Sequence, residues 1–228
     1  MDTFMPRPSY PKTDEDKAKV YLHCMVEVKE RLRLVQTVRS IEMPALFIKE
    51  VGYLQLRYIC ELIAIGCLVA QGDYETQRTF RDEYSPPKIF NALRNKYPHF
   101  FPQPSTVTSS ENHHHLEANS KPGAYVESQV SKLWNASGDH LHRASITSYL
   151  KKTFAPAPDL MSLDADIRGI IELLESHIIP IWQQAEQMRL LQVHMEDGTG
   201  NVEAHWMDFD LNTNELTIST FRSGLTRG

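Results

Sequence analysis

Short motifs that identify the common enzyme classes are missing from this chain of 228 residues. It contains neither the glycine-lysine loop that cradles nucleotide phosphates nor the glycine-rich turn that binds dinucleotides. It also lacks the serine elbow of α/β-hydrolases, the paired histidines of zinc proteases and the paired cysteines of zinc ribbons. The sequence therefore gives no support to an ATP-, dinucleotide-, serine-hydrolase or zinc-protease function.

Cysteine is also scarce, with three residues, and their positions do not indicate disulfides. Cys60 and Cys67 lie one heptad apart on one expected helix, roughly 10 Å along its axis, which is too far for a bridge. Cys24 lies on the apolar face of another expected helix. We interpret all three as reduced core residues of a cytoplasmic protein.

Positive charge is not in excess, since the net charge is −5 and the isoelectric point is about 6.1. The chain therefore has no general attraction to nucleic acid, although a helix face with Lys29, Arg31 and Arg33 could bind phosphates locally. The first residues lack the apolar run of a signal peptide, and the apolar stretch at residues 62–70 is too short to span a bilayer. We expect no contact with a membrane.

Apolar residues recur at helical spacing in the first part of the chain. Residues 13–39 are expected to form one helix, which begins at the capping hydroxyl of Thr13. Residues 44–71 are expected to form a second helix that is apolar on nearly all sides and therefore central to a bundle. Because glycine weakens a helix, Gly66 within it predicts a close helix crossing.

The rest of the chain combines a polar segment, further helices and strand-like runs. Residues 99–123 are rich in Ser, Thr, Asn and Pro, and are predicted to be a long loop. Strand-like runs on both sides of the glycine turn at 196–200 predict a hairpin, with Trp206 or Phe209 packing onto the bundle or onto a second subunit. The expected fold is mainly α, a multi-helix bundle with a small C-terminal antiparallel β hairpin or meander (α+β). Its expected parts are a flexible N-terminus (1–12), a helical bundle containing the loop (13–176), a β appendage (177–221) and a flexible tail (222–228).

Two charged residues, Arg57 and Glu61, lie in the central helix, four positions apart and on one face. Charges on a buried helix are costly unless they are paired and hydrogen-bonded. Asp139, His142 and Arg143, near the end of a later helix, could meet them. The sequence therefore predicts a buried polar cluster of these five residues. It is either structural or part of a binding or catalytic site with a shifted histidine pKa.

The segments RYICE at 57–61 and HLHR at 140–143 resemble parts of uncharacterised bacterial helical-bundle proteins. They are also similar to the HEPN superfamily, whose ribonucleases use an arginine and a histidine separated by four to six residues. This resemblance implies metal-independent cleavage of RNA. The catalytic candidates that it implies are His142 and the pair Arg94 and His99, which has the family spacing but is interrupted by Pro98.

The remaining histidines do not predict a metal site. The run at 113–115 has no Cys, Asp or further His nearby to complete a ligand set. With the turn centred as expected, His194 would lie opposite Val202 and His205 opposite Leu191, so the two would not share a site. We therefore expect no metal and no cofactor.

Two functions remain open from the sequence. The first is a non-catalytic binding or interaction protein of a regulatory or defence-associated kind, and the second is a metal-independent HEPN-type ribonuclease. A protein partner or self-association is expected, and nucleic acid is the less favoured partner. A ribonuclease should bring a histidine and an arginine together in a basic groove, whereas an interaction protein should seal Arg57 and Glu61 inside and expose an apolar patch elsewhere.

Overall fold

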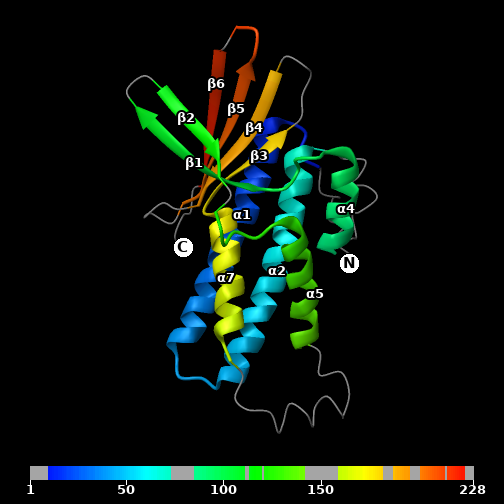
Figure 1. The fold of residues 1–228 in the computed structure, drawn as a ribbon, viewed down its shortest axis with the longest axis vertical. Coiled ribbons are helices and arrows are strands. Elements are labelled where there is room, and N and C mark those ends of the chain that lie inside the picture. The colour runs from blue at the N-terminus through cyan, green and yellow to red at the C-terminus, as the bar shows by residue number, and fades with distance from the viewer. Residues whose placement is uncertain are drawn as a thin grey trace, which may run out of the picture.

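The structure is a computed structural model that describes residues 10–72, 85–110, 113–119, 121–141, 159–181, 187–195, 201–213 and 215–223. These residues form helices that run along one axis and a sheet at one end of them (Figure 1). The helices are α1 (Asp14–Ser40), α2 (Ala45–Gln71), α4 (Pro86–Lys96), α5 (Glu127–Leu141) and α7 (Met161–Leu174). The strands are β1 (Gln103–Ser110), β2 (His113–Ala118), β3 (Ser176–Ile181), β4 (Gln187–His194), β5 (Glu203–Asp210) and β6 (Glu215–Arg222). The α+β class expected from the sequence is therefore confirmed, and the expected flexible ends lie mostly outside the described residues.

The first helix, α1, begins where the sequence predicts, at a capping box formed by Thr13 and Asp16. The Asp16 N–H donates to Thr13 Oγ1 (3.0 Å), and the Thr13 N–H donates to the Asp16 carboxylate (3.2 Å). These bonds satisfy two amides that a helix start otherwise leaves unpaired. At the other end of the helical pair, α2 stops at Gly72, whose left-handed φ of 68° lets its N–H reach the Val69 carbonyl.

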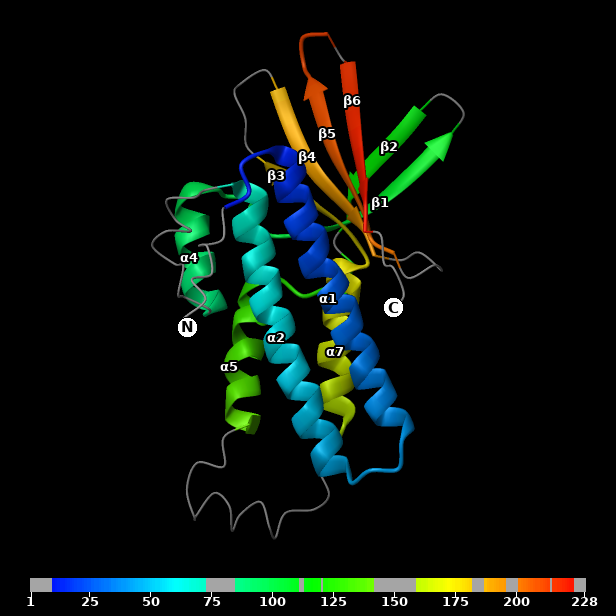
Figure 2. The same cartoon turned by 180° about the vertical axis from the view of Figure 1, so that it is seen from behind.

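The second helix, α2, is the centre of the bundle, as its apolar sequence predicts. It packs along α1 and α5 and also contacts α4 and α7 (Figure 2). A Cβ at Gly66 would lie 3.0 Å from the ring of Tyr21 on α1, and a Cβ at Gly52 would lie 2.6 Å from Leu163 on α7. The close crossing predicted at Gly66 is therefore confirmed, whereas the closer one at Gly52 is not predicted from the sequence.

The three cysteines are buried and free, so the thiols belong to the core. Burial raises the pKa of Cys24 to about 12, which keeps this thiol protonated and unreactive. By length and composition alone, α2 is also apolar enough to cross a membrane. However, 67% of its most apolar window is buried inside the protein, as in the core helix of a globular domain.

The strands form one antiparallel sheet in the order β2-β1-β3-β4-β5-β6. The hairpin β1–β2 comes from the middle of the chain and joins the C-terminal strands where Gln103 and Pro104 pair with Ile178 and His177 of β3. The expectation of a long loop at 99–123 is therefore wrong. The expectation of a mainly α bundle with a small C-terminal hairpin or meander understates the sheet, because β1 and β2 extend the C-terminal meander β3-β4-β5-β6. The middle segment has no apolar alternation to indicate a strand, and it takes the strand conformation through pairing with the rest of the sheet.

One face of the sheet packs on the helices. Its apolar side chains belong to the same core as α1 and α2: Ile179, Ile181, Leu191, Val193, Ala204 and Trp206. Within this core, Tyr21 of α1 and His177 of β3 are both buried, and the Tyr21 O–H donates to His177 Nε2 at 2.7 Å. His177 Nδ1–H donates to the Leu174 carbonyl at 2.9 Å, which fixes the neutral tautomer of the imidazole.

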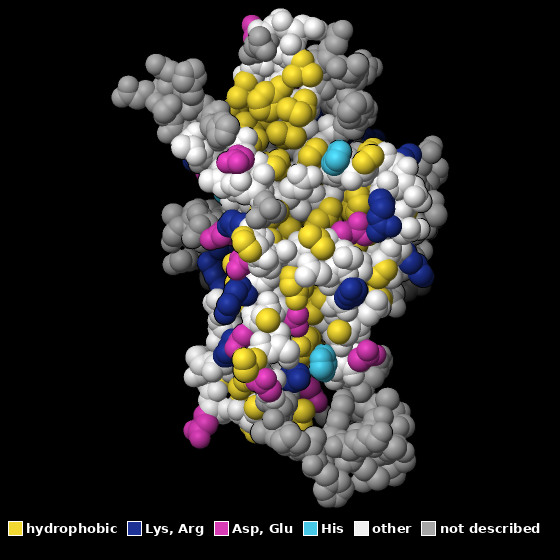
Figure 3. Space-filling view, viewed as in Figure 1, with side chains coloured by type: hydrophobic (Ala, Val, Ile, Leu, Met, Phe, Trp, Pro, Cys, Tyr) yellow, Lys and Arg dark blue, Asp and Glu magenta, His cyan; other side chains and the backbone are white. Residues whose placement is uncertain are grey.

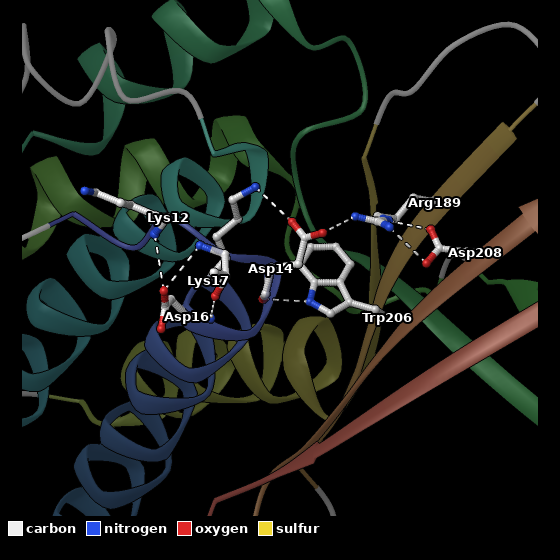
Figure 4. Close-up of polar contacts among 8 residues, drawn as sticks. Lys12, Asp14, Asp16, Lys17, Arg189, Trp206 and Asp208 are labelled. Atoms are coloured by element: carbon white, nitrogen blue, oxygen red, sulfur yellow. Dashed lines mark hydrogen bonds and ion pairs between the residues drawn. The ribbon is translucent and has the colours of Figure 1, made fainter.

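Hydrogen bonds and ion pairs connect the N-terminus of α1 to β4 and β5 (Figure 4). Arg189 of β4 donates to Asp14 (2.5 Å) and to both carboxylate oxygens of Asp208, while Lys17 donates to Asp14 (3.0 Å). The Trp206 indole N–H donates to the Asp14 carbonyl (3.0 Å), so the predicted packing of Trp206 on the bundle is confirmed. Burial alone would raise the pKa of Asp14, but the hydrogen bonds from Lys17 and Arg189 lower it below its usual value.

The buried His177 should make the stability of the fold depend on pH. Burial lowers the pKa of His177 to about 4, whereas in an unfolded chain it is about 6.5. Between these values the unfolded state binds the extra proton, so the free energy of unfolding should fall as the pH drops, by up to about 1.4 kcal/mol per pH unit. Urea denaturation between pH 7 and 4 should show a shallower pH dependence for His177→Gln than for the parent protein.

The matched control for this measurement is His23→Gln, because His23 is an exposed residue of α1. This variant should follow the parent curve at every pH. A pH dependence in His177→Gln as steep as that of the parent would contradict the assignment of the effect to His177.

Candidate functional site

Arg57 and Glu61 of α2 lie against α5, where both contact Trp134. Arg57 Nε is 3.5 Å from the Glu61 carboxylate, and the Trp134 indole N–H donates to the same carboxylate at 2.9 Å. The Arg57 guanidinium lies over the Trp134 ring, 4.2 Å from its centroid, in a cation–π contact. A Cβ at Gly138 would lie 2.8 Å from Arg57 Nη1, so the glycine leaves room for the guanidinium. A tryptophan therefore completes this cluster.

Of the other three predicted members, the structure describes Asp139, and this residue does not join the cluster. Asp139 is exposed near the end of α5, and the neighbouring His140 stacks on the Tyr53 ring at a centroid distance of 4.0 Å. His142 and Arg143 lie outside the described residues. The side chains of Arg57 and Glu61 keep 23% and 18% of their surface accessible, so the cluster is half-buried and not sealed in the core.

The candidate pair Arg94 and His99 lies near a groove of about 890 Å³ between the α4–β1 and β2–α5 connections. His99 lines this groove at an exposed position after α4 has ended. Arg94, in the last turn of α4, is bound to the Glu127 carboxylate of α5. Lys121, which also lines the groove, is paired with Glu175 at 2.6 Å. Acidic partners therefore neutralise both Arg94 and Lys121.

The face of the sheet that points away from the helices, called the outer face below, has an apolar half and a polar half. Because side chains alternate along a strand, the register across β4, β5 and β6 lines them up in rows. The apolar rows are Met188–Phe209–Leu216 and Leu190–Met207–Ile218, and the polar rows are Gln192–His205–Thr220 and His194–Glu203–Arg222. Figure 3 shows the apolar half as a continuous hydrophobic surface at the sheet end of the molecule.

The polar half contains two histidines held by hydrogen bonds. His194 Nδ1 lies 3.1 Å from Ser176 Oγ, and His194 Nε2 lies 2.9 Å from the Gln192 amide. His205 Nδ1 lies 2.9 Å from Thr220 Oγ1, and the two imidazole centroids are 6.0 Å apart. The ring nitrogens of His194 are therefore both occupied by protein groups.

The register between β4 and β5 corrects the sequence expectation for these histidines. His194 pairs with Glu203, and not with Val202, while His205 pairs with Gln192. A shift of one residue moves every side chain of a strand to the opposite face. The two imidazoles, expected on different faces, therefore lie on the same one.

Neutral imidazoles characterise this half of the outer face. Burial, and then the neighbouring His205, lowers the pKa of His194, and burial lowers the pKa of His205 despite the opposing effect of Glu203. At neutral pH both side chains therefore act as hydrogen-bonding groups and not as cations. Among the described residues, no group of three or more His, Cys, Asp or Glu side chains could hold a metal ion.

The apolar half of the outer face was not singled out from the sequence. Its signal is the period-two alternation in β6, where Leu216 and Ile218 are separated by Thr217 and followed by Ser219. The sequence shows this alternation, but it does not show which set of side chains faces the helices. In β6 the helix-facing residues are Thr217 and Ser219, which are exposed, and Phe221, which packs on the core, while Leu216 and Ile218 point outward.

Removal of the Glu61 carboxylate should destabilise the protein moderately. Glu61→Ala removes the ion-pair partner of Arg57 and the acceptor of the Trp134 indole N–H, while Arg57 Nη1 keeps its hydrogen bond to the Trp134 carbonyl at 3.4 Å. Because the charged side chains still reach solvent, we expect a loss of about 1–2 kcal/mol, and not the 3–5 kcal/mol of a sealed pair. Glu61→Gln should lose less, since its amide oxygen can still accept from Trp134. Urea denaturation at pH 7 measures both variants.

The matched control is Glu30→Ala, which breaks an exposed ion pair with Arg33 and should change the stability by less than about 0.5 kcal/mol. If Glu61→Ala and Glu30→Ala have equal effects, the cluster on α2 and α5 makes no special contribution to stability.

Comparison with known proteins does not place the chain in a family. No family model, no curated protein and no solved structure matches it. Its function must therefore be inferred from its own residues and their arrangement.

Proposed function

We propose that the protein is a non-catalytic binding protein that contacts a protein partner through the outer face of its sheet. The observation that carries the proposal is the exposure of Met188, Leu216 and Ile218, with 43%, 37% and 44% of their surface accessible. They lie in adjacent rows, beside the buried Leu190 and Met207 of the same face.

The arrangement of these residues favours an interface over an ordinary surface. Exposed apolar side chains scattered singly are common in soluble proteins. Here they are gathered on one half of one face and bordered by polar rows, as is typical of protein–protein contact sites (Figure 3). A partner that covered them would gain about 25 cal/mol for each Å² of apolar surface removed from water.

The charged groups of the bundle give less support to a catalytic or phosphate-binding function. The basic residues Lys29, Arg31 and Arg33 of α1 are all hydrogen-bonded within the protein. Binding of phosphates along this helix would therefore compete with existing contacts. Arg57 and Glu61 are likewise engaged with one another and with Trp134.

A metal-independent ribonuclease remains the alternative prediction. One observation favours keeping it, namely that His99 is accessible in a groove large enough for a nucleotide. Arg94 would have to leave Glu127 to act beside it. His142, the other candidate, lies outside the described residues.

The proposed location, cofactor requirement and class of partner are based on the sequence. We propose a cytoplasmic protein that needs neither cofactor nor metal, whose partner is a protein and not a membrane. A regulatory or defence-associated role is part of the same proposal, and the exposed apolar half of the outer face is the surface through which it would act.

Site-specific photo-crosslinking tests the proposed surface. A photoreactive amino acid at position 188, 216 or 218 should give adducts with a defined protein in cells. The same group at Met161, which is 74% exposed at the end of α7 that lies away from β3, should not. Excess purified parent protein should suppress the specific adducts. Equal labelling from all four positions would contradict a binding surface on the sheet.

An RNA cleavage assay without divalent metal tests the alternative. We expect the purified protein to leave both structured and single-stranded RNA intact, because Arg94 and Lys121 are neutralised by acids near His99. Cleavage that disappears in a folded His99→Ala or His142→Ala variant would overturn the proposal and identify the histidine.

A further inference from the structure

The strand β6 forms one end of the sheet and has an open edge. Among the described strands it pairs with β5 alone. The Ser223 N–H donates to the Val202 carbonyl at 3.0 Å, which makes this pair one of the hydrogen-bonded pairs of the ladder. In an antiparallel ladder such pairs recur at every second residue, so the intervening residues direct their N–H and C=O groups away from β5. These residues are Leu216, Ile218, Thr220 and Arg222.

This edge lacks the features by which proteins usually prevent further pairing. Edge strands are commonly shortened, bulged, or interrupted by proline or lysine. By contrast, β6 runs unbroken for eight residues, contains neither Pro nor Lys, and carries charge only at Glu215 and Arg222, its two ends. Both views of the fold show β6 and the β1–β2 hairpin diverging from each other (Figures 1 and 2). The edge is therefore suited to accept one more strand.

The residues with free backbone groups also carry the side chains of the outer face. Leu216 and Ile218 continue the two apolar rows, and Thr220 and Arg222 continue the two polar rows. A strand added to this edge would therefore meet apolar side chains at one end and polar or charged side chains at the other. On the helix-facing side it would meet Thr217 and Ser219, which are exposed and uncharged.

We propose that the partner binds by adding an extended peptide segment to β6 as a further antiparallel strand. This inference rests on the proposed binding function and names the form of the partner. Read from its N-terminus, the segment presents to the outer face an acidic residue opposite Arg222, a small polar residue opposite Thr220, and apolar residues opposite Ile218 and Leu216. Main-chain hydrogen bonds hold it, and the alternate side chains select it.

The direction of the strand is set by charge and by the pattern of the sheet. The strands of the described sheet are all antiparallel to their neighbours, and that pairing is slightly the more stable one. Arg222 is bound by Glu203 at the polar end, so an acidic residue of the peptide would join an existing ion pair. A peptide with its apolar residues at the polar end would place them beside Arg222 and His205, where they would desolvate polar groups.

Binding of a synthetic peptide to the full chain tests the proposal. The probe is a fluorescent seven-residue peptide in which an acidic residue, threonine, isoleucine and leucine alternate with polar residues in this order. N-methylation of its threonine and isoleucine amides, which face β6, should weaken binding at least tenfold. N-methylation of the residue between them should have little effect, because that amide points away from β6. Equal sensitivity of both sets of amides would overturn the strand geometry.

Variants of the protein provide the second arm of the test. Ile218→Pro removes an N–H that points to the open edge and is not bonded to β5, so the fold should survive while binding weakens at least tenfold. Ile218→Lys should weaken it similarly and guards against misfolding of the proline variant. Met161→Lys, the matched control at an exposed apolar residue of α7, should bind as the parent does. Unchanged binding by a folded Ile218→Lys would overturn the proposal.

Sedimentation distinguishes binding of a segment from another protein from self-association of the chain through β6. If the protein forms a dimer that Ile218→Lys dissolves, and the monomer does not bind the peptide, β6 pairs with itself and the proposal is overturned. Photo-adducts at positions 216 and 218 without peptide binding would also overturn strand addition. That result would leave the proposed binding function in place, so the two failures can be distinguished.

Discussion

Burial of one face of β3, β4 and β5 against α1 and α2 is the constraint on which the rest of the structure depends. The Tyr21–His177 hydrogen bond lies within this contact, where neither group reaches water. A buried imidazole is tolerated there because both of its nitrogens are satisfied. At the edge of the same contact, Arg189 and Trp206 hold the first turn of α1 through Asp14. Together these contacts fix the register and the orientation of the sheet on the bundle.

Once that face is fixed, the opposite face of the sheet is fixed as well. Every second residue of β4, β5 and β6 must point away from the helices, whatever its chemistry. Two rows of these outward residues are apolar, and they lie on the face turned away from the described helices. The apolar surface therefore makes no contact with the described helices, and this is the physical reason for the proposal that a partner covers it. The open edge of β6 lies along the same surface, so backbone and side-chain recognition can act on one bound segment.

In the bundle, the spacing of the charged residues in the sequence predicts some of their contacts but not all of them. Arg57 and Glu61 lie at a spacing that brings them together on any helix, and they do form an ion pair. Their third partner is Trp134, an aromatic residue on a different helix, which offers both a ring face and an N–H donor. The spacing of the charged residues does not predict that a tryptophan of another helix contacts them. In the same way, Arg94 and His99 have the spacing of a known catalytic pair, but Arg94 is bound to Glu127.

The sequence by itself determined the local features of this protein. The capping box at Thr13, the central position of α2, the close crossing at Gly66 and the antiparallel pairing of β4 with β5 all follow from residues near one another in the chain. Only the tertiary structure decided the features that depend on long-range pairing. The strands β1 and β2 have no apolar alternation and were expected to be a loop. They join the sheet because distant β3 offers a ladder to Gln103 and Pro104. The β4–β5 register differs by one residue from the register expected from the turn, and this difference places His194 and His205 on the same face. Because successive side chains of a strand point to opposite faces, the turn sequence alone does not define the register closely enough to predict the face.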